Sequence, residues 1–332
     1  MYGLPSANRA FPIDALFAVP IFSESGTRCR FFPHTAFLNC MEYCDIRRYL
    51  EKNVKLLERY REKRMKLGVS TYSWLWSQTV EDAVRILGDN GIRRVEFSIS
   101  PPHFNLDAYR PGSYRKLRKV MDEYGMEAVS VNIPSMDINI ASPFPEMRRM
   151  TVGLYKRLAL VAAELNAKIM IIPPGKRHPL LPPDYNLIYS YAKDSICQLA
   201  DHIQDTDLII GVETLPSLFI DTTTQLKTLV NDIASEHVKI VYDAANVFGL
   251  EDPAETLKEV REELCLLHLS DTKRSKWEHN ILGTGELDSK AFIDAAKAIG
   301  YDGHLVLEVI SSDGIGGILH SIDTLKRHGL LD

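Results

Sequence analysis

Eight short apolar runs, each followed by a helix-forming stretch, dominate the chain from Lys66 to its end. Most are rich in Val, Ile and Leu, as are strands that are buried on both faces of a parallel sheet. They cover Leu67–Thr71, Arg94–Ile99, Ala128–Ile133, Lys168–Ile172, Leu208–Thr214, Lys239–Asp243, Leu266–Ser270 and His304–Val309. Such alternation predicts an α/β chain with the (β/α)₈ architecture of a TIM barrel, whose usual length is about 250 residues.

The stretches between these runs carry the start and stop signals of helices. Thr79-Val-Glu-Asp82 has the spacing of a capping box, and Gly91 provides a stop after the apolar residues that follow. Asp252-Pro253 combines a cap with a first-turn proline, while Asp288 and Gly300 bracket another apolar helix. These signals predict helices between the strands, as a barrel requires.

An open, doubly wound sheet is the main alternative fold for such a chain. That fold binds nucleotides through a glycine-rich turn after its first strand. Here the first strand runs into Thr71-Tyr-Ser-Trp-Leu-Trp76, which contains no glycine. The closed barrel is therefore the preferred architecture.

The first 64 residues differ from the rest and predict an N-terminal extension in front of a barrel domain at 65–332. Residues 1–44 mix Pro, Phe, Ser, Asn and Cys without a clean period, whereas Asp45–Arg64 is charged and helix-prone. Two interpretations are open. The extension is either a segment whose amphipathic helix docks on the barrel, or translated sequence upstream of a natural start at Met65.

Charge and cysteine content argue against several classes of protein. The net charge is −5 with 25% charged residues, which argues against a nucleic-acid-binding surface. No apolar run approaches the length that spans a bilayer, and Ala15–Phe22 is too short for a secretory signal. Five cysteines without a C-x-x-C pair are typical of reduced thiols, so we expect a cytoplasmic protein.

Polar residues end four consecutive predicted strands, at the barrel edge where enzymes of this fold carry their active sites. They are Glu213, Asp243, His268 and Glu308. Any one of them alone is more often a loop cap or a hydrogen-bonded core residue. Together, three carboxylates at a barrel mouth would repel one another and raise each other's pKa values, and a divalent cation removes that conflict.

The donor set also predicts the kind of cation. Three carboxylates and one imidazole suit Mn²⁺, which we expect, with Mg²⁺, Co²⁺ and Zn²⁺ as alternatives. A thiolate-rich zinc site is excluded because no cysteine falls at the end of a predicted strand. The sequence thus predicts one divalent metal ion as the cofactor.

Five short motifs follow one another along residues 65–332. They are Val212-Glu213, Tyr242-Asp-Ala-Ala-Asn246, His268-Leu-Ser-Asp271, Gly283-Thr-Gly-Glu-Leu-Asp288 and Leu307-Glu-Val309. In this order they resemble the xylose-isomerase-like TIM barrels of the sugar phosphate isomerase/epimerase superfamily. That superfamily includes ketose 3-epimerases, hydroxypyruvate isomerases, inosose dehydratases and endonuclease-IV-type nucleases, and the motifs are weak evidence for any one activity.

The resemblance implies an isomerase or epimerase of a small keto-sugar or related polyol ketone. It places the metal on Glu213, Asp243, His268 and Glu308, and gives Glu213 and Glu308 the added role of exchanging protons with the substrate. Removal of a proton next to a carbonyl yields an enediolate. The carbon and face that take the proton back decide between epimerisation and isomerisation, and loss of a β-hydroxyl would give dehydration.

Two departures from family patterns bear on the activity. Asn246 stands where many epimerases carry His, as expected in inositol-catabolism branches, so an inosose-type dehydratase is the alternative. Strand four ends in Pro173-Pro-Gly175 without a preceding His, unlike the multi-zinc nucleases, and the acidic net charge also disfavours a nuclease. A non-catalytic sugar-binding barrel is the remaining alternative.

Four further residues are candidates for substrate binding, namely Glu96, Asn246, His279 and Trp74. Glu96, near the end of strand two, would bind a hydroxyl unless it caps a loop. His279 lies in the loop after strand seven. Trp74 follows strand one, where it would line the pocket with Tyr72 and Trp76 or pack into the core.

Two more segments near the predicted mouth have a functional and a structural interpretation. Asp271 is expected to orient His268, as metal-bound imidazoles usually require a hydrogen-bond partner. Gly314-Ile-Gly-Gly317 precedes the last helix and would bind a phosphate or, as we prefer, form a loop. The expected partner is a small-molecule sugar or polyol, with no nucleic acid and no membrane, and a homo-oligomer is compatible with the sequence.

Overall fold

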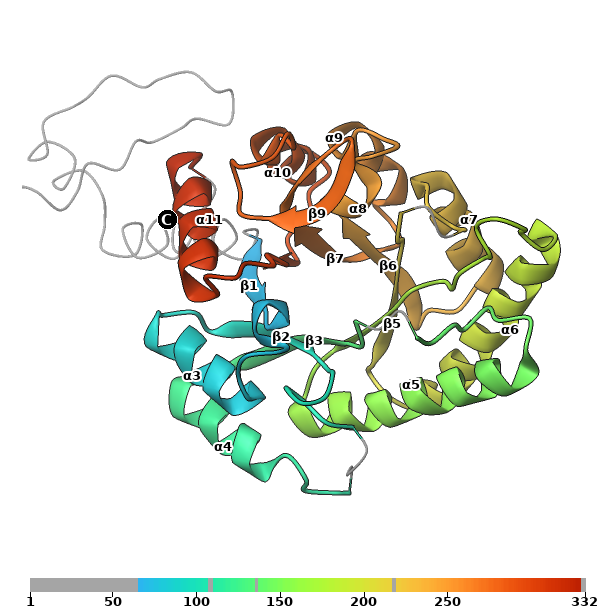
Figure 1. The fold of residues 1–332 in the computed structure, drawn as a ribbon, viewed down its shortest axis with the longest axis horizontal. Helices are drawn as coiled ribbons and strands as arrows, with labels where there is room; N and C mark the ends of the chain where they lie inside the picture. Colours follow the sequence, from blue (N-terminus) through green and yellow to red (C-terminus); the bar gives the residue numbers. More distant parts are fainter. Residues whose placement is uncertain (1–64, 107–109, 135–136, 217–218, 330–332) are drawn as a thin grey trace, which may run out of the picture. The chain divides into compact units, whose positions relative to one another are not determined.

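A computed structural model of the chain describes residues 65–106, 110–134, 137–216 and 219–329. Eight parallel strands form a closed barrel in the spatial order β1-β10-β7-β6-β5-β4-β3-β2 (Figure 1). They are β1 (Lys66–Ser70), β2 (Arg94–Ser98), β3 (Glu127–Asn132), β4 (Ile169–Ile172), β5 (Ile209–Glu213), β6 (Val238–Asp243), β7 (Leu264–Leu269) and β10 (His304–Leu307). The predicted barrel is confirmed, and each predicted strand matches the observed one to within two residues at either end.

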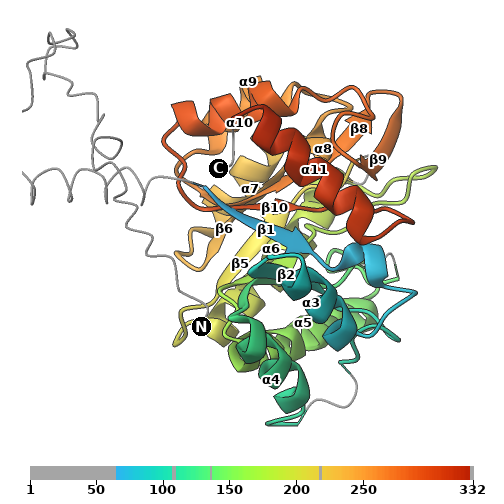
Figure 2. The ribbon, with the colours of Figure 1, turned by 90° about the vertical axis from the view of Figure 1, so that its left-hand side faces the viewer.

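Helices surround the barrel and connect its strands (Figure 2). The longer ones are α3 (Val80–Asp89), α4 (Arg115–Tyr124), α5 (Pro145–Leu165), α6 (Tyr185–Ile203), α7 (Thr223–Ile233), α10 (Ser289–Ala298) and α11 (Ile315–Arg327). Short helical turns lie in two of the connections: η2 (Tyr72–Trp74) follows β1, and α8 (Ala244–Val247), α9 (Pro253–Thr256) and η3 (Leu257–Val260) join β6 to β7.

Local sequence explains where these helices begin and end. Thr79 accepts a hydrogen bond from the Asp82 N–H at the start of α3, and its hydroxyl donates to the Asp82 carboxylate. Asp288 caps α10 by accepting from a backbone N–H of the first turn. Gly91 and Gly300 follow α3 and α10 with φ of 78° and 76°, a left-handed conformation that glycine adopts easily.

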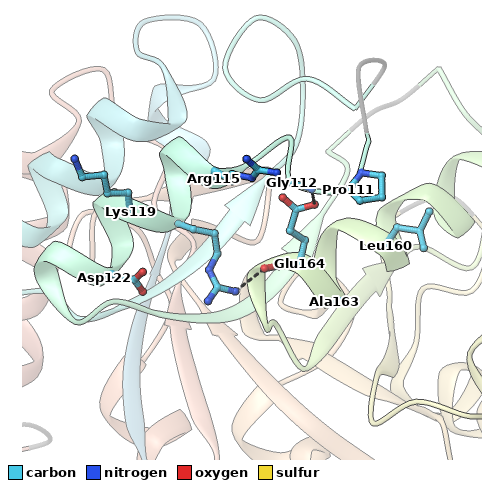
Figure 3. A pocket seen from close by; sticks show the side chains of 9 residues that line it. Pro111, Gly112, Arg115, Lys119, Asp122, Leu160, Ala163 and Glu164 are labelled. Atoms are coloured by element: carbon cyan, nitrogen blue, oxygen red, sulfur yellow. Dashed lines mark hydrogen bonds between the residues drawn. The ribbon is translucent and has the colours of Figure 1, made fainter.

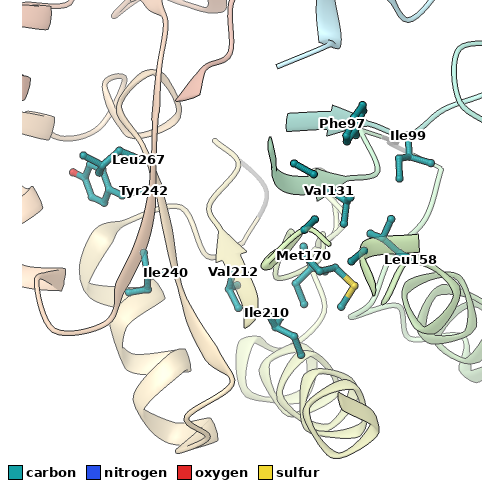
Figure 4. Packing of buried hydrophobic residues seen from close by; sticks show 14 of the residues in the cluster. Phe97, Ile99, Val131, Leu158, Met170, Ile210, Val212, Ile240, Tyr242 and Leu267 are labelled. Carbon is teal, nitrogen blue, oxygen red and sulfur yellow. The ribbon is translucent and has the colours of Figure 1, made fainter. Parts of the chain in front are cut away.

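Side chains along each strand alternate between the surrounding helices and the barrel interior. Outward residues such as Val212 of β5 and Ile240 of β6 join helix residues such as Leu158 in one large apolar core (Figure 4). A separate inner cluster fills the barrel and consists of Val129, Ile169, Ile171, Val241, Leu266 and Val306. The two clusters follow from the period of two along a strand.

The inward positions become polar at the C-terminal ends of four strands. Two residues after the inward Gly211, Val241, Leu266 and Val306 come Glu213, Asp243, His268 and Glu308. Strand register aligns these ends, since Asp243 pairs with His268 across β6 and β7. The inner cluster therefore forms an apolar floor beneath a polar layer.

The connection after β7 contains an antiparallel hairpin that the sequence did not predict. Strand β8 (Asp271–Lys273) pairs with β9 (Lys276–Asn280) through the registers Asp271–Asn280 and Lys273–Lys276. Its residues lack the alternation of apolar and polar side chains that would reveal a strand. The hairpin begins at the C-terminal end of β7, so its side chains can reach the polar layer.

The predictions for residues 1–64 lie outside the described residues, so the division near residue 65 stays a prediction. The same holds for Cys29, Cys40 and Cys44, whereas Cys197 and Cys265 are free thiols. Within the described ranges, every helix is too short or too polar to cross a membrane.

Gly211→Ala is expected to destabilise the barrel, because an added Cβ would lie 2.4 Å from Val241 Cγ2 and 3.1 Å from Ile169 Cγ2. Overpacking of this kind costs roughly 1–3 kcal/mol. Gly153→Ala is the matched control, since its Cβ would meet nothing within 4 Å on an exposed part of α5. It should raise the free energy of unfolding by about 0.5–1 kcal/mol. Urea unfolding compares the two, and a Gly211→Ala variant as stable as the parent would contradict the packing of the inner cluster.

Candidate metal centre

The four residues predicted to bind a metal converge at the C-terminal mouth of the barrel. One ligand atom from each of Glu213, Asp243, His268 and Glu308 can be chosen so that all lie within 4.8 Å of one another, and all four residues are buried. Bonds of about 2.0–2.2 Å to one cation place opposite donors no more than about 4.4 Å apart. Small side-chain movements would therefore let the four donors share one ion.

Asp243 offers the clearest sign that a cation fits here. Its Oδ1 accepts hydrogen bonds from the backbone N–H groups of Ala245 (2.6 Å) and Asn246 (3.0 Å), which caps α8. Its Oδ2 is buried without a hydrogen-bond partner and lies 3.8 Å from His268 Nδ1. A buried carboxylate oxygen without a donor is costly unless an ion or water completes its shell.

Glu96 holds His268 at the ring nitrogen that faces away from the other candidate ligands. Its Nε2 lies 2.9 Å from Glu96 Oε2, and its Nδ1 faces the candidate ligands, 3.0 Å from Glu213 Oε1. Glu96 is fully buried and also accepts a 2.6 Å hydrogen bond from Ser130 Oγ. An Nε2–H donated to Glu96 fixes the tautomer that leaves the Nδ1 lone pair for a metal.

This arrangement bears on two expectations. Glu96 was expected to bind a substrate hydroxyl; its buried Oε2 contacts the imidazole, and substrate binding by Glu96 stays a prediction. Asp271 was expected to orient His268, but its carboxylate accepts from backbone N–H groups of Thr272, Gly283 and Leu287 and so shapes the loop after β7. Both residues are acidic and lie close to strand ends, so sequence alone could not separate their roles, and nothing in the sequence pointed to Ser130.

The electrostatics of the cluster favour an added positive charge. Burial, reinforced by Asp243 and Glu96, raises the pKa of Glu213 to about 7 despite the opposing effect of His268. Burial and the neighbouring carboxylates also raise the pKa of Glu308 well above its ordinary value. Burial disfavours the charged imidazole, but the surrounding carboxylates outweigh it and raise the pKa of His268 well above its ordinary value. A divalent cation would relieve this crowding of like charges.

His279 and Tyr72 border the same space. His279, on β9, places Nδ1 3.3 Å from Glu308 Oε2 and 3.0 Å from the hydroxyl of Ser270, a contact that the sequence did not suggest. Burial lowers the pKa of His279 and so favours its neutral form. Burial, followed by the charges of Glu308 and Glu213, raises the pKa of Tyr72 to about 12.

The other two candidates for substrate binding are buried away from solvent. Trp74 is 4% exposed and belongs to the large apolar core. Asn246 is 2% exposed, and its amide donates to the Thr214 carbonyl and accepts from Trp277 Nε1. The structure therefore brings His279 to the candidate metal site, while Trp74 and Asn246 contact other protein groups.

The segment Gly314-Ile-Gly-Gly317 was predicted to precede the last helix as a loop, but α11 begins at Ile315, so only Gly314 precedes it. The carboxylate of Asp313 lies against Gly316 and the hydroxyl of Ser311 against Gly317, both in the first turn of the helix. An acidic side chain at the position of a phosphate would repel it. This geometry disfavours a phosphate site, and the loop prediction is wrong for residues 315–317.

A surface hollow of about 580 Å³ lies elsewhere, on the outer surface along α4 and α5 (Figure 3). There the Glu164 carboxylate accepts from the backbone N–H groups of Gly112 and Tyr114, and Arg118 donates to the Glu164 carbonyl. These contacts join the two helices. The hollow is thus a structural junction separate from the barrel mouth.

Comparison with known proteins places the chain among related barrels. A family model described as xylose isomerase-like TIM barrel matches residues 84–328. The chain is also similar to MJ1311, an uncharacterised protein of Methanocaldococcus jannaschii, with 24% identity over 270 residues that cover 80% of this chain and 89% of that protein.

Several solved structures share the fold, each matching 80% of this chain. A D-tagatose 3-epimerase-like protein has a TM-score of 0.71 and 23% identity over 97% of its chain. The 3-keto-D-glucoside 4-epimerase YcjR from E. coli has a TM-score of 0.67 and 19% identity over 100% of its chain. The IOLI protein with a bound zinc atom has a TM-score of 0.67 and 17% identity over 98% of its chain. At these identities the likeness establishes a common fold.

The stability of the metal-free protein is expected to fall as pH rises from 6.5 to 8.5. Groups whose pKa is raised by folding bind protons more tightly in the folded state, and this holds for Glu213, Glu308 and His268. Stability therefore declines as those protons are lost. Added Mn²⁺ should raise the melting temperature more at pH 8.5 than at pH 6.5, because protons compete with the metal. Thermal unfolding with EDTA or Mn²⁺ measures both effects, and metal-free stability that rises over this interval would contradict them.

Glu96→Gln is expected to weaken metal binding by roughly 10–100-fold, because it removes the charged partner of His268 Nε2. Competition with a fluorescent chelator measures the affinity. Ser130→Ala is the graded control, since it removes only one donor to Glu96 and should have a smaller effect. An affinity of Glu96→Gln within twofold of the parent would show that Glu96 does not support the metal ligand.

Proposed function

Because the chain belongs to the family of xylose isomerase-like TIM barrels, we propose that it is a metal-dependent isomerase or epimerase of a small keto-sugar or polyol-derived ketone. The observation that carries this proposal is the order of the four candidate ligands around the barrel. Glu308, directly after β10, and Glu213 on β5 flank His268 on β7 and Asp243 on β6. A substrate bound above these residues would have a glutamate on each side.

The proposed cofactor is one divalent ion held by these four side chains, with Mn²⁺ as the preferred metal and Mg²⁺, Co²⁺ and Zn²⁺ as alternatives. Three carboxylates and one imidazole form a mainly oxygen donor set that suits such ions. When bound, the ion supplies Lewis acidity that polarises a substrate carbonyl and makes the adjacent C–H more acidic.

Glu213 and Glu308 are the proposed acid–base pair. One glutamate removes the proton next to the carbonyl, and the enediolate form of the substrate results. The other glutamate returns a proton on the opposite face to give the epimer, or to the neighbouring carbon to give the isomer. The strands β10, β7, β6 and β5 are neighbours in this order, and the two glutamates follow or end the outer two. Removal of a proton by one glutamate and its return by the other need such opposite positions.

His279 and Tyr72 are proposed to hold substrate hydroxyls beside the glutamates. The contact of His279 with Glu308 places a neutral imidazole at the edge of the site. Because the pKa of Tyr72 is raised to about 12 by burial and by the nearby glutamates, its hydroxyl stays protonated and can donate a hydrogen bond. Both groups would orient the substrate for proton transfer.

An inosose-type dehydratase is the alternative that Asn246 suggests. Both ends of the Asn246 side-chain amide contact protein groups, Thr214 and Trp277, which gives this alternative less support than an isomerase or epimerase. A non-catalytic sugar-binding barrel would retain binding without proton exchange. Isotope exchange separates this last alternative from the enzyme.

Metal-loaded protein incubated in D₂O with a panel of ketoses is expected to place deuterium on the carbon next to the carbonyl of its substrate. Mass spectrometry and proton NMR of the recovered sugars measure the incorporation. If no recovered sugar contains deuterium with any of the four metals, Mn²⁺, Mg²⁺, Co²⁺ and Zn²⁺, the proposal is wrong.

Glu308→Gln is expected to lower deuterium exchange by about 10²–10⁴-fold at saturating metal, since it removes one of the two proton-transfer groups. Glu127→Gln is a control at an acidic residue whose side chain is 52% exposed, and it should exchange like the parent. If Glu308→Gln and the parent exchange deuterium at equal rates, Glu308 is not one of the proton-transfer groups.

A further inference from the structure

Trp277 is an exposed aromatic residue that is nevertheless fixed in place. It lies on β9, is 47% exposed, and donates its Nε1–H to Asn246 Oδ1 at 2.8 Å. Single exposed aromatic residues are common on protein surfaces and need no function. What distinguishes Trp277 is that a buried amide beside the candidate metal centre anchors it.

Asn246 connects Trp277 to the candidate metal ligands. Its backbone N–H donates to Asp243 Oδ1, and its side-chain amide donates to the Thr214 carbonyl directly after Glu213. The remaining amide oxygen accepts from the indole. One buried residue thus links the ends of β5 and β6 to the hairpin, so the indole holds a defined position relative to the ligands.

The indole lies just outside the space where the proposed chemistry would occur. Residues two apart on a strand share a face, and Trp277 packs edge-on against His279 with ring centroids 5.9 Å apart. His279 in turn lies 3.3 Å from Glu308. His279 therefore lies between Trp277 and Glu308.

We infer that Trp277 is a stacking platform for the C–H face of a sugar ring, and that Asn246 is the positioning residue that holds it. The inference rests on the proposed function and narrows its substrate class to ring-closed or glycosidically linked keto-sugars. A short open-chain ketone would fill the site without reaching the indole. Aromatic side chains provide large rigid contact surfaces at small entropic cost, and the anchored indole is already ordered before binding.

Binding can be measured without turnover by protection of Trp277 from acrylamide quenching. The background is metal-loaded full-length Trp76→Phe protein, because Trp76 is 77% exposed and would obscure the signal, whereas Trp74 is buried. Methyl β-D-glucopyranoside and cellobiose should protect the fluorescence, and dihydroxyacetone should not. The protected signal should disappear in Trp76→Phe/Trp277→Phe. Equal quenching with and without both saccharides would overturn the inference.

Variants of the platform should affect large substrates selectively. Trp277→Ala is expected to weaken saccharide binding about tenfold, and Trp277→Phe is expected to weaken it less. In both variants the affinity for dihydroxyacetone should change by less than about twofold. Asn246→Ala should resemble Trp277→Ala with a smaller effect, and should raise KM more than it lowers kcat. Its backbone N–H to Asp243 remains, so the cap of α8 is retained.

The two proposals fail in different ways. If no ketose exchanges deuterium but the saccharides protect Trp277, the proposed function is wrong and the platform stands. If exchange occurs and Trp277→Ala binds the saccharides as tightly as the parent, the platform is wrong and the enzyme assignment stands. Loss of dihydroxyacetone binding in Trp277→Ala would show a general disturbance of the mouth and would also overturn the platform.

Discussion

The crowding of buried carboxylates around one imidazole is the constraint on which the mouth of the barrel depends. Glu96, Glu213, Asp243 and Glu308 are all buried around His268. Burial of several like charges is unfavourable unless a positive charge joins them. The residues directly beneath this layer form the apolar inner cluster of the barrel. The site therefore calls for a cation at the position that its donors surround.

Much of this arrangement follows from the sequence because it depends on regular geometry. Eight apolar runs suffice to predict a closed barrel, and barrel closure brings the C-terminal ends of β5, β6, β7 and β10 side by side. The period of two along a strand then determines that Asp243 and Glu308 face inward two positions after Val241 and Val306. Glu213, Asp243, His268 and Glu308 were accordingly identified before the structure, and the structure brings their donor atoms together.

The features that the sequence did not reveal depend on side-chain direction and on contacts between distant residues. Glu96 follows the same pattern as the other strand-end acids, yet it lies at a register shift between β2 and β3 and contacts His268 Nε2. Asn246 and Trp277 are 31 positions apart and meet only because an unpredicted hairpin folds back over the mouth. No local spacing encodes either contact, so sequence reasoning assigned Glu96 and Asn246 to the substrate.

The hydrogen bonds divide the four candidate ligands into two held donors and two freer ones. Two backbone N–H groups fix Asp243, and Glu96 fixes His268 from its far nitrogen. The described contacts of the Glu213 and Glu308 carboxylates are instead with imidazoles, at 3.0 Å from His268 and 3.3 Å from His279. A ligand that also transfers protons must move and change its partners, whereas a pure ligand gains from being rigid. The same division between held and free donors therefore supports the proposal that the glutamates, and not Asp243, carry out the acid–base work.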